Sequence, residues 1–323
     1  MATMTFSQPL VSIVIPCFNT EKYIGEAIES ALSQTYANKE VIVVDDGSSD
    51  KSLAVIQAFG ERIRWLSGAN VGAAEARNKG VAVARGELLQ FLDADDLLYP
   101  QKLAQQVPLS VEFCPGMVFC DADVVDLASN RHRGRWGTGS VSTEDAVIHT
   151  LRTVVQTSGP LHWRESFERV GGFRSEAGAC DDRDLHLRLA CAGIKFHHIS
   201  NVLYMMRRME TSLTKRDPIG GLRVQYRIGE DAFDFLDRSG ALNEGRRASF
   251  AGFFAGTGRR AFRLGATEFA KECFYRAREI HPEGGISQVY SMGGQVMARL
   301  VGVELTEYVS NWKRFLVRDR ELA

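Results

Sequence analysis

The chain has 323 residues, of which 45% are hydrophobic and 24% are charged. These fractions are typical of a soluble globular protein, so extensive disorder and fibrous repeats are excluded. The length is sufficient for two domains of roughly 100–200 residues each. The 39 basic and 40 acidic side chains leave a formal net charge of -1, so no overall cationic field attracts nucleic acid or anionic lipid. A polyanionic ligand must therefore be held by local groups or by a metal ion.

The six cysteines are scattered and include no C-x-x-C pair, which fits neither a disulfide framework nor a zinc site. Reduced thiols in the cytosol are the simplest interpretation. The first residues lack a basic stretch followed by an apolar one, and nowhere do about 18 apolar residues run uninterrupted. The sequence predicts a cytoplasmic protein with neither a standard secretion signal nor a membrane-spanning helix.

Two short runs of β-branched residues, at 11–15 and 41–44, predict buried strands of a mostly parallel sheet. Between them apolar residues recur at helical spacing, so the segment from about 20 to 34 is predicted to be an amphipathic helix. Together these segments form one βαβ unit. The same reasoning predicts helices near 51–59 and over 72–84, and extended segments over 62–66 and 88–92.

Polar side chains stand where the predicted strands end. In open α/β sheets the ligand crevice lies outside the carboxyl ends of the strands, so these side chains are expected to share one edge of the sheet. They are Asn19, Asp45, Asp46, Asn70, Asp93 and Asp95.

The rest of the chain is less regular. Residues 117–204 predict mixed strands and helices, and the Gly/Arg-rich stretch 131–139 is expected to be a loop. Further on, the spacing of small and aromatic residues resembles one tetratricopeptide-type helical hairpin, although Ala261 stands where a large residue is usual. One hairpin cannot bury its faces alone, and two more helices are predicted from residue 286 onward. The hairpin positions are Phe254, Gly258, Ala270, Phe274, Ala277 and Pro282.

The segment 93–96, Asp-Ala-Asp-Asp, follows the predicted strand at 88–92. Carboxylates two residues apart can face one side of an extended chain and offer oxygen ligands to Mg²⁺ or Mn²⁺. A metal held in this way would bind a diphosphate without any net positive charge on the protein. Alone the signal is weak, because residues 121–123 repeat the Asp-x-Asp spacing and such pairs often only end a strand.

Five longer sequence motifs, one of which includes residues 93–96, occur along the chain. The strings VSIVIPCFNTEKYIGEAIESAL, KEVIVVDDGSSDKS, NVGAAEARNKGVAVARGELLQFLDADD, RESFERVGGF and CDDRDLHLRLACAG occur in this order, at spacings that resemble the family 2 inverting glycosyltransferases of the GT-A fold. The resemblance covers about residues 10–215. It implies a Rossmann-like, mostly parallel GT-A domain over 1–215, with a nucleotide-binding half at about 10–100 and an acceptor half at about 101–215. A C-terminal α-helical extension would occupy 216–323.

The resemblance also implies roles for residues at the strand ends. Asp45 would accept a hydrogen bond from the nucleotide base, and Arg77 would reach the nucleotide with its forked guanidinium. Asp95 would be the principal ligand of Mn²⁺ or Mg²⁺, with Asp93 beside it and Asp96 as a weaker candidate. From the residues alone, the Asp-Asp-Gly at 45–47 also fits a simple turn, and Arg77 also fits a salt-bridged helix surface. The nucleotide-sugar set is Pro16, Phe18, Glu21, Asp45, Asp46, Asn70, Gly72, Arg77, Asp93 and Ala94.

An inverting transfer needs a carboxylate that takes the proton of the acceptor hydroxyl. In the resemblance Asp182 holds the position of this base, and Asp181 replaces the usual Glu. Acidic residues in the first turn of a helix also favour the helix dipole, which gives Asp181 a structural alternative. Residues 157–162, which include His162, would border the acceptor together with Trp163 and Asp181. A lone histidine also fits a structural role.

The sequence departs from the resembling family near residue 209. Met209 stands where many relatives have a histidine, and a thioether is a poor ligand for a hard cation. The metal would then keep more water ligands, or Arg207 or Arg208 would stabilise the leaving group instead. The Q-x-x-R-W signature and membrane helices of processive synthases are not found, so transfer of single sugars is expected.

The sequence therefore predicts a metal-dependent inverting glycosyltransferase. It would move one sugar from a nucleotide-diphosphate donor, most simply UDP-linked, to an acceptor hydroxyl in cell-surface polysaccharide, glycolipid or glycoprotein synthesis. Two alternatives stay open: a catalytically silent nucleotide-sugar binding or scaffold protein, and a nucleotidyltransferase, although the basic Gly-rich loop of the latter is lacking. No nucleic acid is expected as a partner. The helical extension would mediate protein contact or oligomerisation, or would associate peripherally with the inner face of the membrane.

Overall fold

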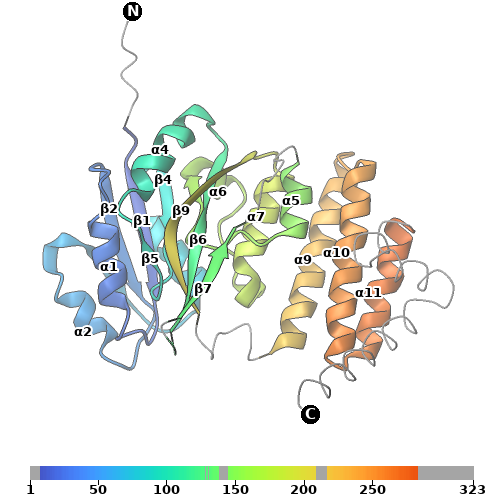
Figure 1. Cartoon of the computed structure of the whole chain (residues 1–323), viewed down its shortest axis with the longest axis horizontal. Helices are drawn as coiled ribbons and strands as arrows, with labels where there is room; N and C mark the ends of the chain where they lie inside the picture. The colour runs from blue at the N-terminus through green and yellow to red at the C-terminus, as the bar shows by residue number, and fades with distance from the viewer. Residues whose placement is uncertain (1–7, 128, 130, 138–144, 209–216, 283–323) are drawn as a thin grey trace, which may run out of the picture. The chain divides into compact units, whose positions relative to one another are not determined.

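The computed structural model of the chain describes residues 8–127, 129, 131–137, 145–208 and 217–282. It contains two compact units, Met1–Arg216 and Asp217–Ala323. Figure 1 draws the first unit in blue to yellow and the described helices of the second in orange. No helix among the described residues is long and apolar enough to cross a membrane.

The first unit is built on a nine-stranded sheet in the order β3-β2-β1-β4-β8-β6-β9-β5, with β7 paired to β6. Strands β3, β2, β1 and β4 are parallel to one another, and β6 is parallel to β9. Within the described ranges, only β8, β5 and β7 form antiparallel pairs with their neighbours. The predicted mostly parallel α/β architecture is therefore confirmed. The strands are β1 (Val11–Cys17), β2 (Lys39–Asp45), β3 (Arg64–Ser67), β4 (Leu88–Phe91), β5 (Leu97–Leu98), β6 (Met117–Asp126), β7 (Arg131–Trp136), β8 (Leu161–Trp163) and β9 (Phe196–Arg208).

The helices predicted in the first hundred residues all form, each one shorter than its predicted segment. They begin after the polar residues at the strand ends and end before the next apolar run. The helices of the first unit are α1 (Ile24–Leu32), α2 (Ser52–Gln57), α3 (Ala73–Val83), α4 (Lys102–Glu112), α5 (Ala146–Arg152), α6 (Arg164–Arg169) and α7 (Asp181–Cys191), with short 3-10 turns η1 (Gly60–Arg62) and η2 (Ser175–Cys180).

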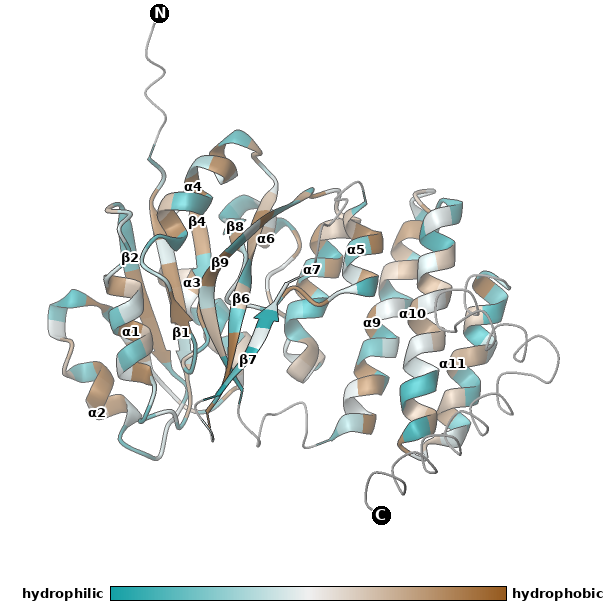
Figure 2. Cartoon of the chain, in the orientation of Figure 1, coloured by the Kyte–Doolittle hydropathy of each residue, from teal (hydrophilic) through white to brown (hydrophobic). Residues whose placement is uncertain are grey.

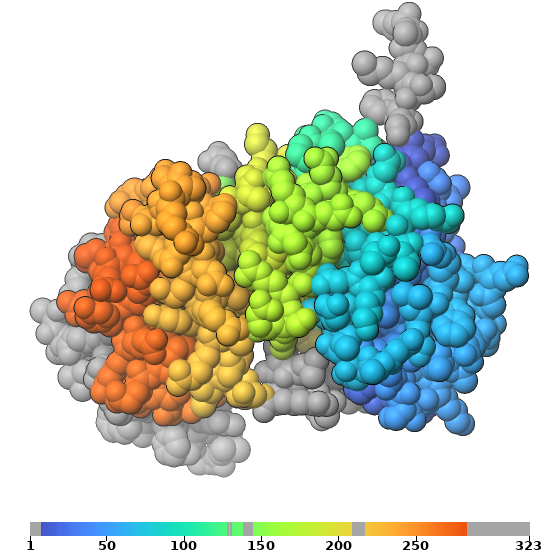
Figure 3. Space-filling model, turned by 180° about the vertical axis from the view of Figure 1, so that it is seen from behind, coloured from blue at the N-terminus to red at the C-terminus, as the bar shows by residue number. Residues whose placement is uncertain are grey.

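Helices cover both faces of the sheet because successive side chains of a strand point to opposite faces. Val43 belongs to the apolar cluster that contains α1, whereas its neighbour Val44 packs with Ala76 of α3. Gly80 lets α3 approach β1 closely, since a Cβ atom there would overlap the Val14 side chain. The central strands are correspondingly brown in Figure 2. Seen from behind in Figure 3, the cyan surface of the first hundred residues lies against the green surface of residues near 150–190.

The prediction of a loop over 131–139 is wrong, because residues 131–136 form β7, which pairs with β6. The segment has few apolar residues and is teal in Figure 2. Its exposed arginines are compatible with an edge strand because they pair with the acidic residues of β6, as in the 2.6 Å contact between Arg133 and Asp126. Composition alone did not show these cross-strand pairs.

The second unit contains three described helices, α9 (Pro218–Arg238), α10 (Glu244–Arg263) and α11 (Thr267–Ile280). Gly258 lies where α10 meets α11, and a Cβ atom there would come within 2.9 Å of Cys273 and 3.0 Å of the Ala270 carbonyl oxygen. A small residue is therefore needed at this crossing. The buried Ala261 lies one turn further along α10. The helices predicted from residue 286 onward lie outside the described residues.

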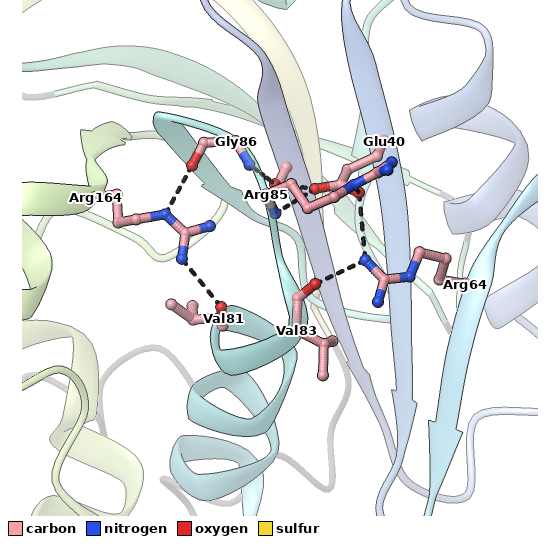
Figure 4. A network of polar contacts seen from close by, with 8 residues as sticks. Glu40, Arg64, Val81, Val83, Arg85, Gly86 and Arg164 are labelled. Atoms are coloured by element: carbon pink, nitrogen blue, oxygen red, sulfur yellow. Dashed lines mark hydrogen bonds and ion pairs between the residues drawn. The ribbon is translucent and has the colours of Figure 1, made fainter.

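The edge of the sheet at which β1 and β2 begin is held by a network of charged groups (Figure 4). Glu40 accepts hydrogen bonds from the Ser12 hydroxyl at 2.7 Å and from the Arg85 backbone N–H at 2.6 Å and side-chain Nε at 3.0 Å. Arg64 and Arg164 donate to backbone carbonyls of α3, at Val83 and Val81 respectively. Cations at these positions complement the carboxyl end of the α3 dipole.

Candidate functional site

The polar residues that follow the strands lie at the opposite edge of the sheet, as predicted. Cys17 pairs with Asp45 and Val14 pairs with Phe91, so β1, β2 and β4 end close together. The loops after β1 and β2 are joined by hydrogen bonds. Ser49 donates its backbone N–H to Asn19 Oδ1 at 2.8 Å.

Two of the predicted nucleotide-binding carboxylates are engaged with the protein itself. Asp45 is buried and accepts hydrogen bonds from the Ser67 hydroxyl at 2.8 Å and the Ser48 N–H at 3.3 Å. Asp46 accepts the backbone N–H groups that precede α3, from Val71 at 2.9 Å and Gly72 at 2.8 Å. Both carboxylates therefore shape the loops at the strand ends.

Glycine is required between these loops. Gly47 has a φ of 75°, and a Cβ atom there would come within 2.8 Å of the backbone nitrogen of Asn70. The turn after β2 can thus lie directly against the loop that leads into α3. The turn interpretation of residues 45–47 describes this backbone, and it does not exclude a ligand next to it.

The remaining residues of the nucleotide set differ in exposure. Phe18 is 48% exposed at the end of β1, rather than buried in the core. Glu21 is exposed and accepts the Lys51 backbone N–H at 2.8 Å, which joins the first loop to α2. Pro16 and Ala94 are buried, and Asn70 and Gly72 are exposed.

The carboxylates of residues 93–96 lie at the end of β4 in unequal environments. Asp93 forms an ion pair, whereas burial and the nearby Asp93 charge raise the pKa of Asp95 to about 6. Asp96 is buried, accepts the Ser158 hydroxyl at 2.8 Å and the Arg207 backbone N–H at 3.0 Å, and has a raised pKa because of burial and of Asp95. Asp96 therefore braces the loop, while Asp93 and Asp95 lie closer to the surface.

Arg77 connects the carboxylate loop after β4 with the first turn of α7. Its Nη2 donates to Asp93 Oδ1 at 2.6 Å and its Nη1 donates to Asp181 Oδ2 at 2.5 Å. The guanidinium also lies 5.0 Å from the centre of the Phe173 ring. Arg77 is only 5% exposed, and the charges of Asp181 and Asp93 outweigh burial and raise its pKa. The guanidinium fork thus binds two carboxylates that are 88 residues apart in the sequence.

Asn78, the neighbour of Arg77, strengthens the same connection. Its side-chain amide donates to the Phe173 carbonyl at 2.9 Å and accepts the Phe173 N–H at 3.0 Å. Gly172 must be small here, because a Cβ atom would come within 2.8 Å of Asn78 Oδ1. Two adjacent side chains of α3 therefore position the Gly-Gly-Phe turn that precedes α7.

Asp182 lies in the first turn of α7 beside this bridge. Its Oδ1 accepts the backbone N–H of Arg183 at 2.6 Å. Burial, followed by the neighbouring Asp181 charge, raises the pKa of Asp182 to about 7. A carboxylate with this pKa is half protonated near neutral pH, which suits exchange of a proton with a substrate hydroxyl.

Ser158, which the sequence did not single out, and Arg207, one of the predicted leaving-group arginines, complete the site. Ser158 is buried, accepts the Asp93 backbone N–H at 3.2 Å and donates to Asp96. It lies within the segment 157–162 that was predicted to border the acceptor. Arg207 reaches Glu26 on α1 and stacks over Tyr23 at 5.7 Å. A single serine and a backbone N–H give no sequence signal that would reveal these contacts.

The other predicted residues lie further from the carboxylates. The His162 side chain is buried, with its ring stacked 5.4 Å from His186. Trp163 pairs with Leu88, at the beginning of β4, and so lies toward the opposite edge of the sheet. Arg208 is exposed and stacks over Trp136 at 5.4 Å. Met209 lies outside the described residues.

A divalent cation fits the donor chemistry of this edge. Within the described ranges, no group of three or more His, Cys, Asp or Glu residues is arranged to hold a metal ion by itself. Mg²⁺ and similar ions are, however, commonly bound by one or two carboxylates together with substrate phosphates and water. Asp93 and Asp95 supply such oxygens, and a cation would relieve the repulsion that raises the pKa of Asp95.

Several solved structures share the fold of this chain. The chain superimposes on Staphylococcus aureus TarS 1–349 with a TM-score of 0.68 and 18% identity, covering 94% of this chain and 91% of that one. A TarS crystal structure in complex with UDP-GlcNAc gives 0.67. The mannosyltransferase PcManGT from Pyrobaculum calidifontis, in complex with GDP-Man and Mn²⁺, gives 0.58 at 18% identity, with 95% and 88% covered. At these identities the likeness shows the fold, and the predicted GT-A fold is confirmed.

Comparison of sequences identifies the family. The chain is 39% identical to an uncharacterised glycosyltransferase of Rickettsia typhi over 132 residues and 32% identical to the chondroitin synthase of Escherichia coli over 219. It spans only 41% and 31% of the length of these relatives, and 40% and 65% of its own length is matched. Glycosyltransferase GlyG of Streptococcus pneumoniae is 46% identical over 235 residues, or 64% of this chain and 74% of that protein. The sequence model of Glycosyl transferase family 2 matches residues 12–171, and the chain belongs to this family.

Proposed function

We propose that this chain transfers a single sugar, with inversion, from a nucleoside diphosphate sugar to an acceptor hydroxyl. The observation that carries the proposal is the Arg77 bridge, which connects Asp93 at the end of β4 to the turn of α7 that holds Asp182. One side chain thereby connects a carboxylate proposed for the donor complex to the helical turn that carries the carboxylate proposed to take the acceptor proton. UDP-linked sugars are the proposed donors.

Asp182 is the proposed general base. As the acceptor oxygen attacks the anomeric carbon, its hydroxyl proton passes to the Asp182 carboxylate, and the bond from that carbon to the diphosphate oxygen breaks. The diphosphate leaves with the bonding electron pair. The pKa of about 7 keeps a large share of Asp182 ionised at neutral pH while making it a stronger base than an ordinary carboxylate.

The donor would lie over the ends of β1, β2 and β4. Phe18 offers an exposed apolar surface for the nucleoside. Asp45, which is buried and already accepts from Ser67 and Ser48, is the residue proposed to accept a hydrogen bond from the base. A Mn²⁺ or Mg²⁺ ion held by Asp93 and Asp95 would neutralise charge on the leaving diphosphate. Arg207, whose charge acts on Asp95, is the arginine proposed to face the same phosphates.

The proposal assigns Arg77 a positioning role. Both terminal nitrogens of its guanidinium are bonded to Asp93 and Asp181, so they hold the two carboxylates in place. The shortened side chain of Asp181, which replaces the expected Glu, fits this direct pairing. His162 is left out of the proposed acceptor site because it is buried, and Trp163 because it pairs with the beginning of β4, away from the carboxylates.

The proposed function also divides the chain into a transferase domain and a helical extension. We propose that residues 1–215 carry the transfer, with the donor half at about 10–100 and the acceptor half at about 101–215. The helical extension over 216–323 would contact a protein partner or a lipid-linked acceptor at the inner face of the membrane.

The test is to substitute Asp182→Asn and measure sugar transfer and donor binding separately. A general base contributes about 10²–10⁴-fold to rate, so transfer from UDP-GlcNAc with Mn²⁺ should fall by that factor. The shift in melting temperature caused by UDP-GlcNAc should persist, because a ligand bound to the native state still stabilises it. Asp234→Asn, on the exposed surface of α9, is the matched control and should change neither quantity.

Two outcomes would contradict the proposal. Undiminished transfer by the Asp182→Asn variant would exclude Asp182 as the base. Binding of UDP-GlcNAc by the native chain, without turnover on any hydroxyl acceptor in a panel, would favour a silent binding protein.

A further inference from the structure

A lysine is completely buried beneath the carboxylate loop. Lys102 begins α4 and has no exposed surface. No carboxylate lies in ion-pair distance of its ammonium group among the described residues. Burying such a charge without an opposite charge is costly unless every N–H is hydrogen-bonded. A lysine in this position therefore calls for a reason other than packing.

The surroundings of Lys102 supply one acceptor for each ammonium hydrogen. Its Nζ donates to Gln90 Oε1 at 2.6 Å, to the Gly159 carbonyl oxygen at 3.0 Å, and to Gln106 Oε1. A neutral amine has only two hydrogens and would turn its lone pair toward one of these oxygens. Burial lowers the pKa of Lys102 to about 8, so the ammonium form still dominates at neutral pH. The three acceptors are thus matched to a cation.

The same two glutamines extend the network toward the site. Gln106 Nε2 donates to the carbonyl oxygens of Gly159 and of Val118 on β6, each at 3.0 Å. Gln90 Nε2 donates to the Ser158 carbonyl oxygen at 3.0 Å. Both peptide units of the segment 158–159 are therefore fixed from below by side chains that surround Lys102.

Ser158 carries the connection to the carboxylates. Its Oγ accepts the Asp93 backbone N–H at 3.2 Å, and its hydroxyl donates to Asp96 Oδ2 at 2.8 Å. Asp96 in turn holds the Arg207 backbone N–H at 3.0 Å. A continuous chain of hydrogen bonds thus runs from the Lys102 ammonium through Gln90 and Ser158 to the loop 93–96.

We propose that Lys102 is a positioning residue for the carboxylate loop, holding Ser158 so that Asp93 and Asp95 keep the geometry needed to bind a divalent cation with a nucleoside diphosphate. The binding of a divalent cation by this loop rests on the proposed function. The positioning of the loop by Lys102 rests on the hydrogen bonds of Lys102, Gln90 and Ser158. An apolar residue of the same length would fill the space equally well but would leave the oxygens of Gln90, Gln106 and Gly159 without their shared donor.

The experiment compares Lys102→Met and Ser158→Ala with the native full-length chain. Hydrogen exchange followed by mass spectrometry should show amides of residues 93–98 exchanging about tenfold faster in both variants. Titration of Mn²⁺ in the presence of UDP, with free Mn²⁺ measured by electron paramagnetic resonance, should give about tenfold weaker binding, as expected when a residue that orients a ligand is removed. The double variant should be little worse than either single variant.

Lys195→Met is the matched control, because Lys195 is an exposed lysine of the same unit. It should leave both measurements unchanged. Native exchange and native Mn²⁺ binding in Ser158→Ala would overturn the proposal, and this variant decides the matter even if Lys102→Met does not fold. If the native chain binds no Mn²⁺ with UDP, the metal part of the proposed function fails, whereas the exchange measurement still tests the positioning of the loop.

Discussion

The two edges of the sheet use buried carboxylates in opposite ways. Where β1 and β2 begin, burial alone would raise the pKa of Glu40, yet hydrogen bonds from Ser12 and Arg85 bring it below its ordinary value. Where β2 and β4 end, burial and neighbouring acids raise the pKa of Asp95 to about 6 and that of Asp182 to about 7. Where the strands begin, hydrogen bonds stabilise the ionised carboxylate of Glu40. Near the ends of the strands, ionisation of Asp95 and Asp182 destabilises the protein without a ligand.

This difference follows from the number of partners available. Glu40 accepts hydrogen bonds from a hydroxyl, a backbone N–H and a guanidinium. At the other edge Arg77 is shared between Asp93 and Asp181, and their neighbours Asp95 and Asp182 gain little from it. Functional sites often retain such unfavourable charge because a ligand relieves it. We therefore call the edge where β1 and β2 begin the structural edge, and the edge where β2 and β4 end the functional edge.

Removing Arg77 should have the largest effect on this comparison. In Arg77→Ala, Asp93 and Asp181 lose their shared cation in a buried position, so the free energy of unfolding should fall by about 3–5 kcal/mol. Sugar transfer should also be lost, since both carboxylates are released. Urea unfolding monitored by tryptophan fluorescence measures the first effect, and a transfer assay measures the second.

Arg62→Ala is the control for this prediction, because Arg62 pairs with Glu29 on the exposed surface. Exposed ion pairs contribute about 0–1 kcal/mol, so its unfolding should hardly change. Arg77→Lys keeps the charge but not the fork, and should recover part of the stability without recovering transfer. Equal stability of Arg77→Ala and the native chain would show that the bridge does not hold the two halves together.

A substitution at Glu40, where β1 and β2 begin, should lower the stability of the protein without changing catalysis. Glu40→Ala leaves the Ser12 hydroxyl and the Arg85 backbone N–H without their acceptor, so the free energy of unfolding should fall by about 2–3 kcal/mol. The turnover number should stay at its native value, because Glu40 lies at the far end of the strands from Asp93. Glu61→Ala, at an exposed position, is the matched control. A decrease in turnover as large as the decrease in stability would remove the distinction between the edges.

Much of the functional edge could be predicted from the sequence because strand ends are visible in it. The apolar runs of β1, β2 and β4 are short and sharply bounded, so Asp45, Asp93 and Asp95 could be placed at one edge from topology alone. The fold could be predicted for the same reason, together with the family resemblance. The β7 strand could not, because its residues are mostly polar and it depends on pairing with β6.

The partners of the predicted residues could not be read from the sequence. Arg77 was expected to reach a nucleotide, but its fork binds Asp181, which lies 104 residues further along the chain. Lys102 and Ser158 belong to no motif, and only their burial and hydrogen bonds connect them to the site. Sequence patterns predict which backbone segments meet, whereas these pairings depend on the side-chain directions of distant elements.

Asp182→Asn should give the smallest effect on stability, and with the opposite sign to the others. The pKa of Asp182 is about 7 in the folded chain and near 3.8 as an ordinary carboxylate, so the native protein loses stability as pH rises from about 4 through 7 and the carboxylate ionises. Asparagine carries no charge and avoids this loss. Because Asp182 is partly exposed, the variant should be more stable by only about 1–2 kcal/mol at pH 8, and equally stable at pH 4. Melting temperatures at the two pH values measure this difference, and a variant less stable than the native chain at pH 8 would place Asp182 with Glu40 among the structural carboxylates.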